Sequence, residues 1–459
     1  MTGTALVWLR NDLRIVDNPA LHAALKRGRA RAIHIEATDG GLRRRGAASR
    51  WWLHNSLNRL AGELAQLGIP LDTVEGEAET ELFKAIGAHG ADAVYWNRRY
   101  GPAEREIDAG IKARLKRQGI ETESFAANVL VEPFELATGS GKPYSVYTPF
   151  WNALKKRDIA KPLPRPHHRE AIQPQRVDSA FREADWGRKL GKHWQIGETA
   201  ARQRLDRFLD ELVLDYPEDR DIPRKAATSG LSAHLAFGEI SPRQVWHAAQ
   251  AIAQHAPAKA SAIDKFLSEL AWRDFNYNQL YYREDIATVP MVGKYAGLRW
   301  RHDDAALEAW QRGRTGIPII DAGMRELWET GVMHNRVRML TASLLAKNLL
   351  IDWRRGEQWF WDTLVDADPA NNPGNWQWVA GSGLDASPYF RIFNPVTQGE
   401  RFDPTGDYVR RWVPEVAGLP DKLVHRPWET PDAAALDYPA PIVDLSVSRE
   451  RALEAFKAL

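Results

Sequence analysis

The sequence predicts an N-terminal α/β domain with a doubly wound, parallel five-stranded sheet, joined by a long linker to an all-α C-terminal domain. Three observations predict this fold class. Residues 1–130 alternate short β-rich runs with longer helical patterns, residues 131–197 lose that periodicity, and most segments of residues 198–459 repeat at 3.6 residues. These ranges are the expected domain boundaries, and 459 residues suffice for two or three domains.

The N-terminal domain is expected to contain five strands separated by four helices. The strand-like runs are 5–8, 32–35, 71–74, 93–96 and 124–126, and the helical patterns are 20–27, 50–67, 77–88 and 104–118. Such alternation is typical of a parallel sheet with helices on both faces. No Gly-x-Gly-x-x-Gly follows the first strand, so a dinucleotide in the usual crevice is not predicted.

The linker and the helical domain follow from local signals. Residues 161–166 (KPLPRP) cannot continue a helix or a central strand. Beyond them, helical patterns are clearest over 263–282 and 317–352. In the second region Pro318 suits the first turn of a helix, and Gly331 can end that helix in the left-handed conformation.

Composition excludes several classes of protein. With 44% hydrophobic and 27% charged residues the chain is globular, and zero cysteines exclude disulfides, thiolate nucleophiles and cysteine-held metals. There is no apolar run of membrane-span length and no signal peptide after Met1, so we expect a cytoplasmic protein without membrane association. The net charge of +2 confines any polyanion site to a local patch.

Four polar features lie within the helical half. Glu269, Trp272, Arg273 and Asn276 share one face of the 263–282 helix, opposite an apolar stripe, and the central Trp favours a ligand-facing surface over a solvated one. Arginines at 336 and 338 near a helix start oppose the macrodipole, which indicates either an anionic partner or an ordinary surface.

The remaining features are a polar loop and a hydroxyl-rich turn. Asp366 and Asp368 could form an acid/base pair, whereas a metal is not predicted because no further ligands cluster nearby. Residues 228–232 (TSGLS) could cradle a phosphate at a helix start, although such residues usually only cap a helix.

Together these motifs resemble the photolyase/cryptochrome family, specifically bacterial class I-type or class III cyclobutane pyrimidine dimer photolyases. The resemblance also rests on residues 8–14 (WLRNDLR), 144–151 (YSVYTPFW) and 389–395 (YFRIFNP) and covers nearly the whole chain. It implies a carbon–carbon lyase that repairs these dimers in DNA by light-driven electron transfer from reduced FAD. The cofactor then carries the hard chemistry, so the lack of a nucleophile or catalytic triad is expected.

Alternative functions remain open. A cryptochrome-type photoreceptor would bind the same flavin, but the chain ends near residues 456–459 without a long polar tail, which favours repair. Enzymes that repair (6-4) photoproducts resemble this chain but carry histidines at the positions of Asn335 and Met339, and His334 is then an ordinary packed or surface histidine. The remaining alternative is a helical protein that binds single strands.

By resemblance, FAD lies in the helical domain. The residues that would line it are Tyr216, Thr228, Ser229, Gly230, Leu231, Ser232, Phe266, Arg273, Arg338, Asp366, Asp368 and Asn372. Arg338 and Asp366 would pair beside the flavin ring, Asp368 would hydrogen-bond the ring, and Asn372 would face N5. A neutral Asn there, unlike the Asp of plant cryptochromes, favours the reduced anionic flavin.

UV-damaged DNA is the implied partner, and the dimer must leave the duplex to reach a buried flavin, as the base-flipping enzymes do. The dimer pocket would be formed by Glu269, Trp272, Asn276, Asn335, Met339 and Trp378. The residues that would face the DNA strand are Arg220, Arg336 and Gln398. Indoles can stack on the fused pyrimidines and arginines can meet phosphates.

The resemblance also implies an electron relay and an antenna. Trp376, Trp353 and Trp300, among 19 tryptophans, match the family's chain from flavin to surface. Folate-binding members carry an acid on the helix after the fourth strand, and Glu104 occupies that place, which favours methenyltetrahydrofolate over a deazaflavin. A monomer is expected.

Overall fold

The computed structural model describes residues 3–167, 170–175, 177, 186–386, 388–389 and 391–459. Contacts divide the chain into two compact units. The sheet unit comprises residues 1–214 and 229–284, and the helical unit comprises residues 215–228 and 285–459. Helices of 229–284 therefore belong with the sheet, whereas the sequence placed them in the C-terminal domain.

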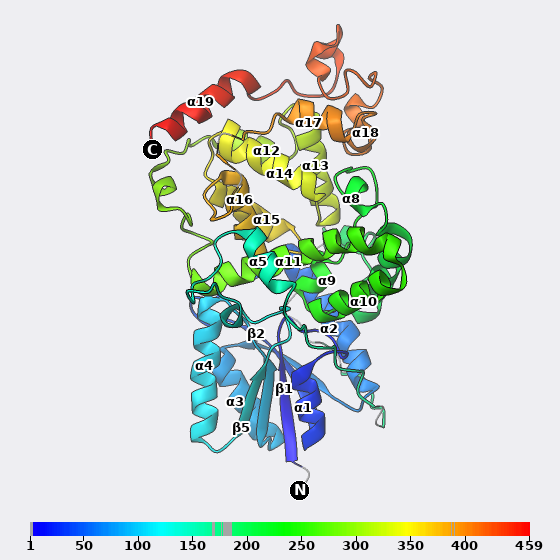
Figure 1. The fold of residues 1–459 in the computed structure, drawn as a ribbon, viewed down its shortest axis with the longest axis vertical. Helices are drawn as coiled ribbons and strands as arrows, with labels where there is room; N and C mark the ends of the chain where they lie inside the picture. The colour runs from blue at the N-terminus through cyan, green and yellow to red at the C-terminus, as the bar shows by residue number, and fades with distance from the viewer. Residues whose placement is uncertain (1–2, 168–169, 176, 178–185, 387, 390) are drawn as a thin grey trace. The chain divides into compact units, whose positions relative to one another are not determined.

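The sheet unit contains five parallel strands in the order β3-β2-β1-β4-β5 (Figure 1). The predicted fold class is confirmed, with all five strands at the predicted places. The strands are β1 (Gly3–Leu9), β2 (Gly28–Ala37), β3 (Leu71–Gly76), β4 (Ala93–Asn97) and β5 (Glu121–Phe125). The order reverses between β1 and β4, and the carboxyl ends of strands at such a point are where ligands usually bind.

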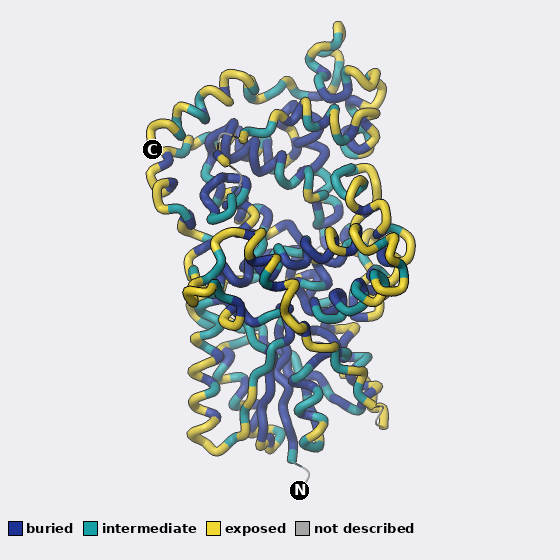
Figure 2. Tube along the Cα trace, in the orientation of Figure 1, coloured by how far each residue is buried: buried dark blue, intermediate teal, exposed yellow. Residues whose placement is uncertain are grey.

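Helices cover both faces of this sheet. They are α1 (Pro19–Arg27), α2 (Ala47–Ala65), α3 (Ala78–His89) and α4 (Pro102–Arg117). Leu6 and Trp8 of β1 pack with α3 and α4 on one face, while α1 contacts β1 and β4. The strands are largely buried, as expected for a parallel sheet covered on both sides (Figure 2).

The rest of the sheet unit is helical. Its helices are α5 (Tyr147–Leu154), α6 (Gly187–Leu190), α7 (Glu198–Arg207), α9 (Ser232–Ala236), α10 (Pro242–His255) and α11 (Ala260–Tyr282). The expected linker of residues 131–197 thus contains α5 and the short α6. Two polar contacts tie α11 to the loop after β5: Asp274 accepts from the Leu130 N–H at 2.5 Å, and Arg273 donates to the Asn128 carbonyl at 2.6 Å.

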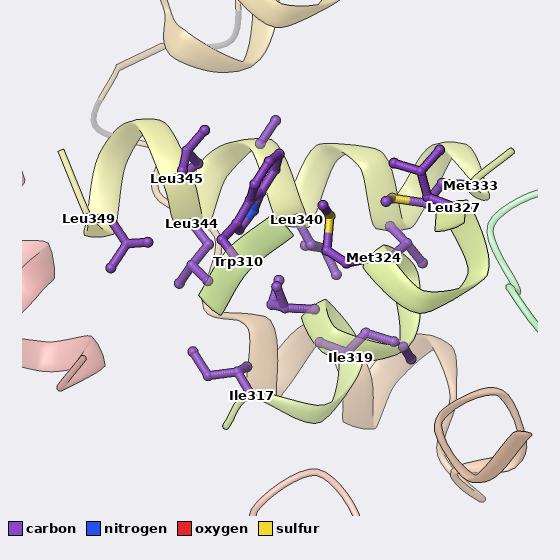
Figure 3. Packing of buried hydrophobic residues seen from close by; sticks show 14 of the residues in the cluster. Trp310, Ile317, Ile319, Met324, Leu327, Met333, Leu340, Leu344, Leu345 and Leu349 are labelled. Carbon is purple, nitrogen blue, oxygen red and sulfur yellow. The ribbon is translucent and has the colours of Figure 1, made fainter. Parts of the chain in front are cut away.

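The helical unit is built around a large apolar core. Its helices are α8 (Tyr216–Asp219), α12 (Asp304–Gln311), α13 (Pro318–Thr330), α14 (Asn335–Ser343), α15 (Trp353–Thr363), α16 (Asn371–Ala380), α17 (Pro395–Phe402), α18 (Asp407–Trp412) and α19 (Leu445–Lys457). Trp310 is fully buried in this core, among Leu340, Leu344 and Leu345 (Figure 3). Gly331 ends α13 at φ 73°, as its position predicted.

None of the helices in the described part of the chain combines the length and the apolar character that a bilayer span needs.

Candidate functional site

The polar face of α11 carries a half-buried indole with a defined plane. Trp272 stacks on Tyr147 of α5, with ring centroids 3.8 Å apart and an interplanar angle of 9°. The Tyr147 hydroxyl donates to the Ser268 carbonyl, one turn before Trp272 on α11. Tyr147 therefore covers one face of the indole and is itself held in place.

Neighbouring residues on α11 have different surroundings. Glu269 accepts from Lys265 at 2.7 Å in an i,i+4 pair. Arg273 points into the protein, where it bonds the Asn128 carbonyl and lies 4.8 Å from the Tyr277 ring. Phe266 is buried against Phe208, with centroids 4.6 Å apart. The residues predicted to share a ligand-facing surface therefore differ in their contacts, because Arg273 holds the loop after β5.

The hydroxyl-rich turn of residues 229–232 lies in the same unit. Gly230 adopts φ +63°, and a Cβ at this position would lie 2.7 Å from Nη1 of Arg204. Ser232 begins α9, which has only five residues. Arg224 and Lys225, which precede this turn in the sequence, belong to the helical unit and pair with Asp407 at 3.6 Å and Asp219 at 2.6 Å.

In the helical unit, both arginines near the start of α14 are paired with carboxylates. Arg338 forms a bidentate ion pair with Asp366 at 3.1 and 2.9 Å and also donates to the Met333 carbonyl. Arg336 lies 2.6 Å from Asp221 and over the Phe402 ring. These acids offset the unfavourable interaction of two cations with the helix N-terminus.

The two acids of the polar loop have separate structural roles. Asp368 accepts from the backbone N–H groups of Ala370 and Asn371 at 2.8 and 2.7 Å, at the start of α16, whereas Asp366 is paired with Arg338. Asn372, on the first turn of α16, donates through Nδ2 to the carbonyl and the carboxylate of Glu357. Within the described ranges, no group of three or more acids and histidines could hold a metal.

The three tryptophans predicted to form the electron relay all pack on the core of the helical unit. Trp376 and Trp353 are 2% and 1% exposed, and Trp300 is partly buried against the same core. The Trp376 ring lies directly against Gly356 of α15, three residues after Trp353, so closely that a Cβ on Gly356 would overlap it. The backbone of α15, which begins at Trp353, thus connects Trp353 to the ring of Trp376.

Two family models match the chain, one described as DNA photolyase over residues 5–167 and one as the FAD binding domain of DNA photolyase over residues 266–458. The deoxyribodipyrimidine photo-lyase of Agrobacterium fabrum is 45% identical over 477 residues, which cover 100% of this chain and 98% of the relative. The chain belongs to the DNA photolyase family.

Two further similar proteins are a photolyase of known structure and a cryptochrome. The crystal structure of a bacterial class III photolyase from Agrobacterium tumefaciens matches with a TM-score of 0.94 and 46% identity, covering 100% of this chain and 98% of that one. Cryptochrome-1 of Arabidopsis thaliana is 35% identical over 100% of this chain and 70% of its own length. The predicted family is therefore confirmed, and its similarity extends along the whole chain.

The predicted site residues fall into two sets, one in each unit. The sheet unit holds those of α11 and residues 229–232, and the helical unit holds the others. Tyr216 is buried, and Cζ of Arg220 lies 5.2 Å from the centroid of the Tyr216 ring. Asn335 is exposed at the first position of α14. Met339, Trp378 and Gln398 are half-buried and Thr228 is exposed in the helical unit, whereas Asn276 of α11 is buried in the sheet unit.

Glu104 occupies the third position of α4. Its carboxylate accepts from the Gly101 N–H at 3.1 Å and lies 3.7 Å from Arg99. At the carboxyl ends of β1 and β4, Arg10 and Arg99 both pair with Asp108, at 3.2 and 2.8 Å. Burial lowers the pKa of Arg10. The usual ligand position of this sheet is therefore occupied by the protein's own ion pairs.

Several residues next to the predicted ones were not singled out by sequence. These are Arg204, Gly356 and Glu357, while Tyr147 was noted only as part of a motif. Each acts through a partner that is distant in the sequence, so no local pattern marks it. The motif of residues 144–151 was the available signal for Tyr147.

Proposed function

We propose that the chain is a deoxyribodipyrimidine photo-lyase, which repairs cyclobutane pyrimidine dimers in DNA in a light-dependent reaction. The observation that carries this proposal is similarity over the full length to a protein of that name. Asn335 and Met339 support dimers over (6-4) photoproducts, because neither residue is a histidine. A cryptochrome role has less support, since Cryptochrome-1 shares 35% identity, against 45% for the deoxyribodipyrimidine photo-lyase of Agrobacterium fabrum.

The residues of this chain fit FAD. Two observations support this fit: the Gly230 turn, whose backbone lies against the Arg204 guanidinium, and the Asn372 amide, whose Nδ2 is committed to Glu357. Bound and reduced FAD supplies, on excitation, the electron that splits the dimer. The cofactor-binding set is as the resemblance implies, with Arg338 and Asp366 as a preformed ion pair.

Asn372 would present a neutral acceptor to the flavin. Its Nδ2 donates to the Glu357 carbonyl at 3.0 Å and to Oε1 at 2.7 Å, which fixes the amide so that Oδ1 is the group left to accept. A neutral amide places no negative charge beside an anionic flavin. This orientation therefore favours the reduced form that repair requires.

The dimer would be held by aromatic side chains that stack on it and by polar side chains that hydrogen-bond to it. Trp272 offers the indole face that Tyr147 does not cover, and Glu269 can accept from base N–H groups. The resemblance adds Asn276, Asn335, Met339 and Trp378 to the residues proposed to contact the dimer. Arg220, Arg336 and Gln398 would contact the strand, with phosphates as the partners of the guanidinium groups.

We further propose a class III-type enzyme, a cytoplasmic monomer, with methenyltetrahydrofolate as antenna. The class III structure neighbour at 46% identity supports the subfamily. Glu104 supports the folate, and the ion pairs of Asp108 argue against a planar antenna at the ends of β1 and β4. Mass analysis of the released chromophore tests this proposal, and a deazaflavin would reject it. The predicted domain boundaries at residues 130 and 198 remain a proposal about which segments fold as separate domains. They differ from the two units defined by contacts.

The repair reaction is tested with purified full-length protein, reduced and mixed with an oligonucleotide that carries one cyclobutane dimer. Under blue or near-UV light the dimer should disappear, measured by chromatography, while a dark sample stays unchanged. A (6-4)-containing oligonucleotide is the specificity control. Loss of dimer at equal rates in light and dark, or exclusive repair of the (6-4) product, contradicts the proposal.

A further inference from the structure

Arg204 of α7 is a half-buried cation without an anionic partner. Its guanidinium lies 4.9 Å from the Trp194 ring, and in the described part of the chain it has neither a hydrogen-bond acceptor nor an ion-pair partner. Comparable arginines of the sheet unit are paired: Arg10 with Asp108, Arg98 with Glu132 and Arg243 with Asp17. Partly burying a charge without a partner costs free energy, so the position of Arg204 requires an explanation that the paired arginines do not.

The guanidinium is directed at the backbone of the hydroxyl-rich turn. A Cβ on Gly230 would lie 2.7 Å from Nη1 and 3.7 Å from Cζ of Arg204. Gly230 also adopts φ +63°, where residues with a side chain are strained. The backbone conformation therefore favours glycine at this position, and the absence of a side chain lets the Arg204 guanidinium lie directly against the turn.

The turn itself supplies polar groups but little charge. Ser229 is half-buried and Ser232 is exposed, so their hydroxyls can meet a ligand. The five residues of α9 are too few to provide a substantial helix dipole. Arg224 and Lys225 are already paired with carboxylates of the helical unit. The cation for an anionic ligand at this turn must come from another side chain, and Arg204 is in place.

We propose that Arg204 is a cofactor-binding residue that holds the diphosphate of FAD against residues 229–232. This inference rests on the proposed function, which places the flavin nucleotide at this turn. A guanidinium presents paired N–H donors that match phosphate oxygens, and stacking on Trp194 keeps its plane fixed. Bound diphosphate would supply the negative charge that Arg204 lacks within the chain.

The test compares FAD release from full-length variants purified with their flavin. Arg204→Gln should raise the dissociation constant of FAD about tenfold, the order expected for a lost charge-assisted hydrogen bond, as measured by flavin fluorescence on dilution. Arg204→Lys should recover part of the loss. The matched control is Arg207→Gln, which removes the same charge one turn along α7 from an exposed pair with Glu211. It should stay within twofold of the original protein.

Salt dependence separates a phosphate contact from a structural role. FAD release from the original protein should increase between 50 and 500 mM NaCl, roughly as screening of a charge pair requires, and Arg204→Gln should flatten this dependence. Circular dichroism and thermal unfolding check that each variant is folded. An unchanged dissociation constant, an unchanged salt dependence, or an equal loss in Arg207→Gln overturns the role of Arg204. If the original protein retains no FAD, the proposed function fails as well.

Discussion

Asn372 and Glu357 form a two-point contact in which the Nδ2 group of Asn372 donates to the backbone carbonyl at 3.0 Å and to the side-chain Oε1 at 2.7 Å. The two residues belong to different helices, α16 and α15. A carboxylate accepts only, so this contact determines which end of the Asn372 amide is directed away from Glu357.

Glu357→Leu should therefore loosen the amide, which keeps only its bond to the backbone carbonyl, and destabilise the reduced flavin. Losing a buried hydrogen bond to a charged acceptor costs about 1.5–3 kcal/mol, so air reoxidation of the reduced enzyme should accelerate at least tenfold. Reoxidation is followed by flavin absorbance after reductant is removed. Asp362→Asn, an exposed change on the same helix, is the control. Equal reoxidation rates in both variants contradict the assigned role of Glu357.

Trp376→Phe tests the electron relay. Phenylalanine retains the packing against Phe360, whose ring centroid is 5.0 Å away, but is much harder to oxidise than an indole. Photoreduction of oxidised FAD should fall at least tenfold, whereas chemically reduced enzyme should repair dimers at nearly the original rate. Transient absorption with an undiminished tryptophan radical would reject Trp376 as the first donor.

Gly356→Ala should disturb the same relay without removing an indole. The added methyl group would overlap the Trp376 ring and Leu345, and overpacking of this kind costs roughly 1–3 kcal/mol of the free energy of unfolding. Urea unfolding measures this loss, and slower photoreduction should accompany it. Gly87→Ala is the control, because that Cβ meets nothing within 4 Å and should stabilise α3 by about 0.5–1 kcal/mol. A variant of Gly356 as stable as the original protein would contradict the close contact.

Tyr147 should determine how well Trp272 recognises a dimer. Tyr147→Phe retains the stacked ring and should bind dimer-bearing DNA within about twofold of the original affinity. Tyr147→Leu removes the stack and should reduce the preference for dimer over undamaged DNA several-fold, because the indole plane is no longer fixed. Gel-shift titrations with the two oligonucleotides measure this ratio. An unchanged preference in a folded Tyr147→Leu protein would show that Trp272 keeps its orientation without Tyr147.

His334 should make stability depend on pH in a defined range. Burial and nearby arginines lower the pKa of His334 from 6.5 to about 4, while its Nδ1 accepts from the Arg336 N–H at 3.2 Å. The unfolded chain takes up a proton near pH 6.5 and the folded chain only near pH 4, so stability is lost as pH falls through this range.

His334→Asn should keep the helix cap and lessen that loss. The expected difference is on the order of 1–2 kcal/mol between pH 7 and pH 4.5. Urea unfolding of the two proteins at several pH values measures it, and other titrating groups cancel in the comparison. Parallel pH profiles for the two proteins would mean that His334 does not titrate as inferred.

The sequence by itself determined the features that depend on local structure. The five strands, the four helices between them, and the end of α13 at Gly331 follow from periodicity and backbone preference within a few residues. The long family motifs were sufficient to identify the family. Only the tertiary structure decided what each functional side chain contacts.

Arg273 illustrates this division. Helical spacing placed it on one face with Glu269 and Trp272, yet it bonds the Asn128 carbonyl, because spacing defines a face but not what packs against that face. The contacts of Tyr147 with Trp272 and of Arg204 with Gly230 likewise join segments distant in the sequence. Such contacts form only when burial of the intervening chain brings the segments together, so no local pattern can specify them.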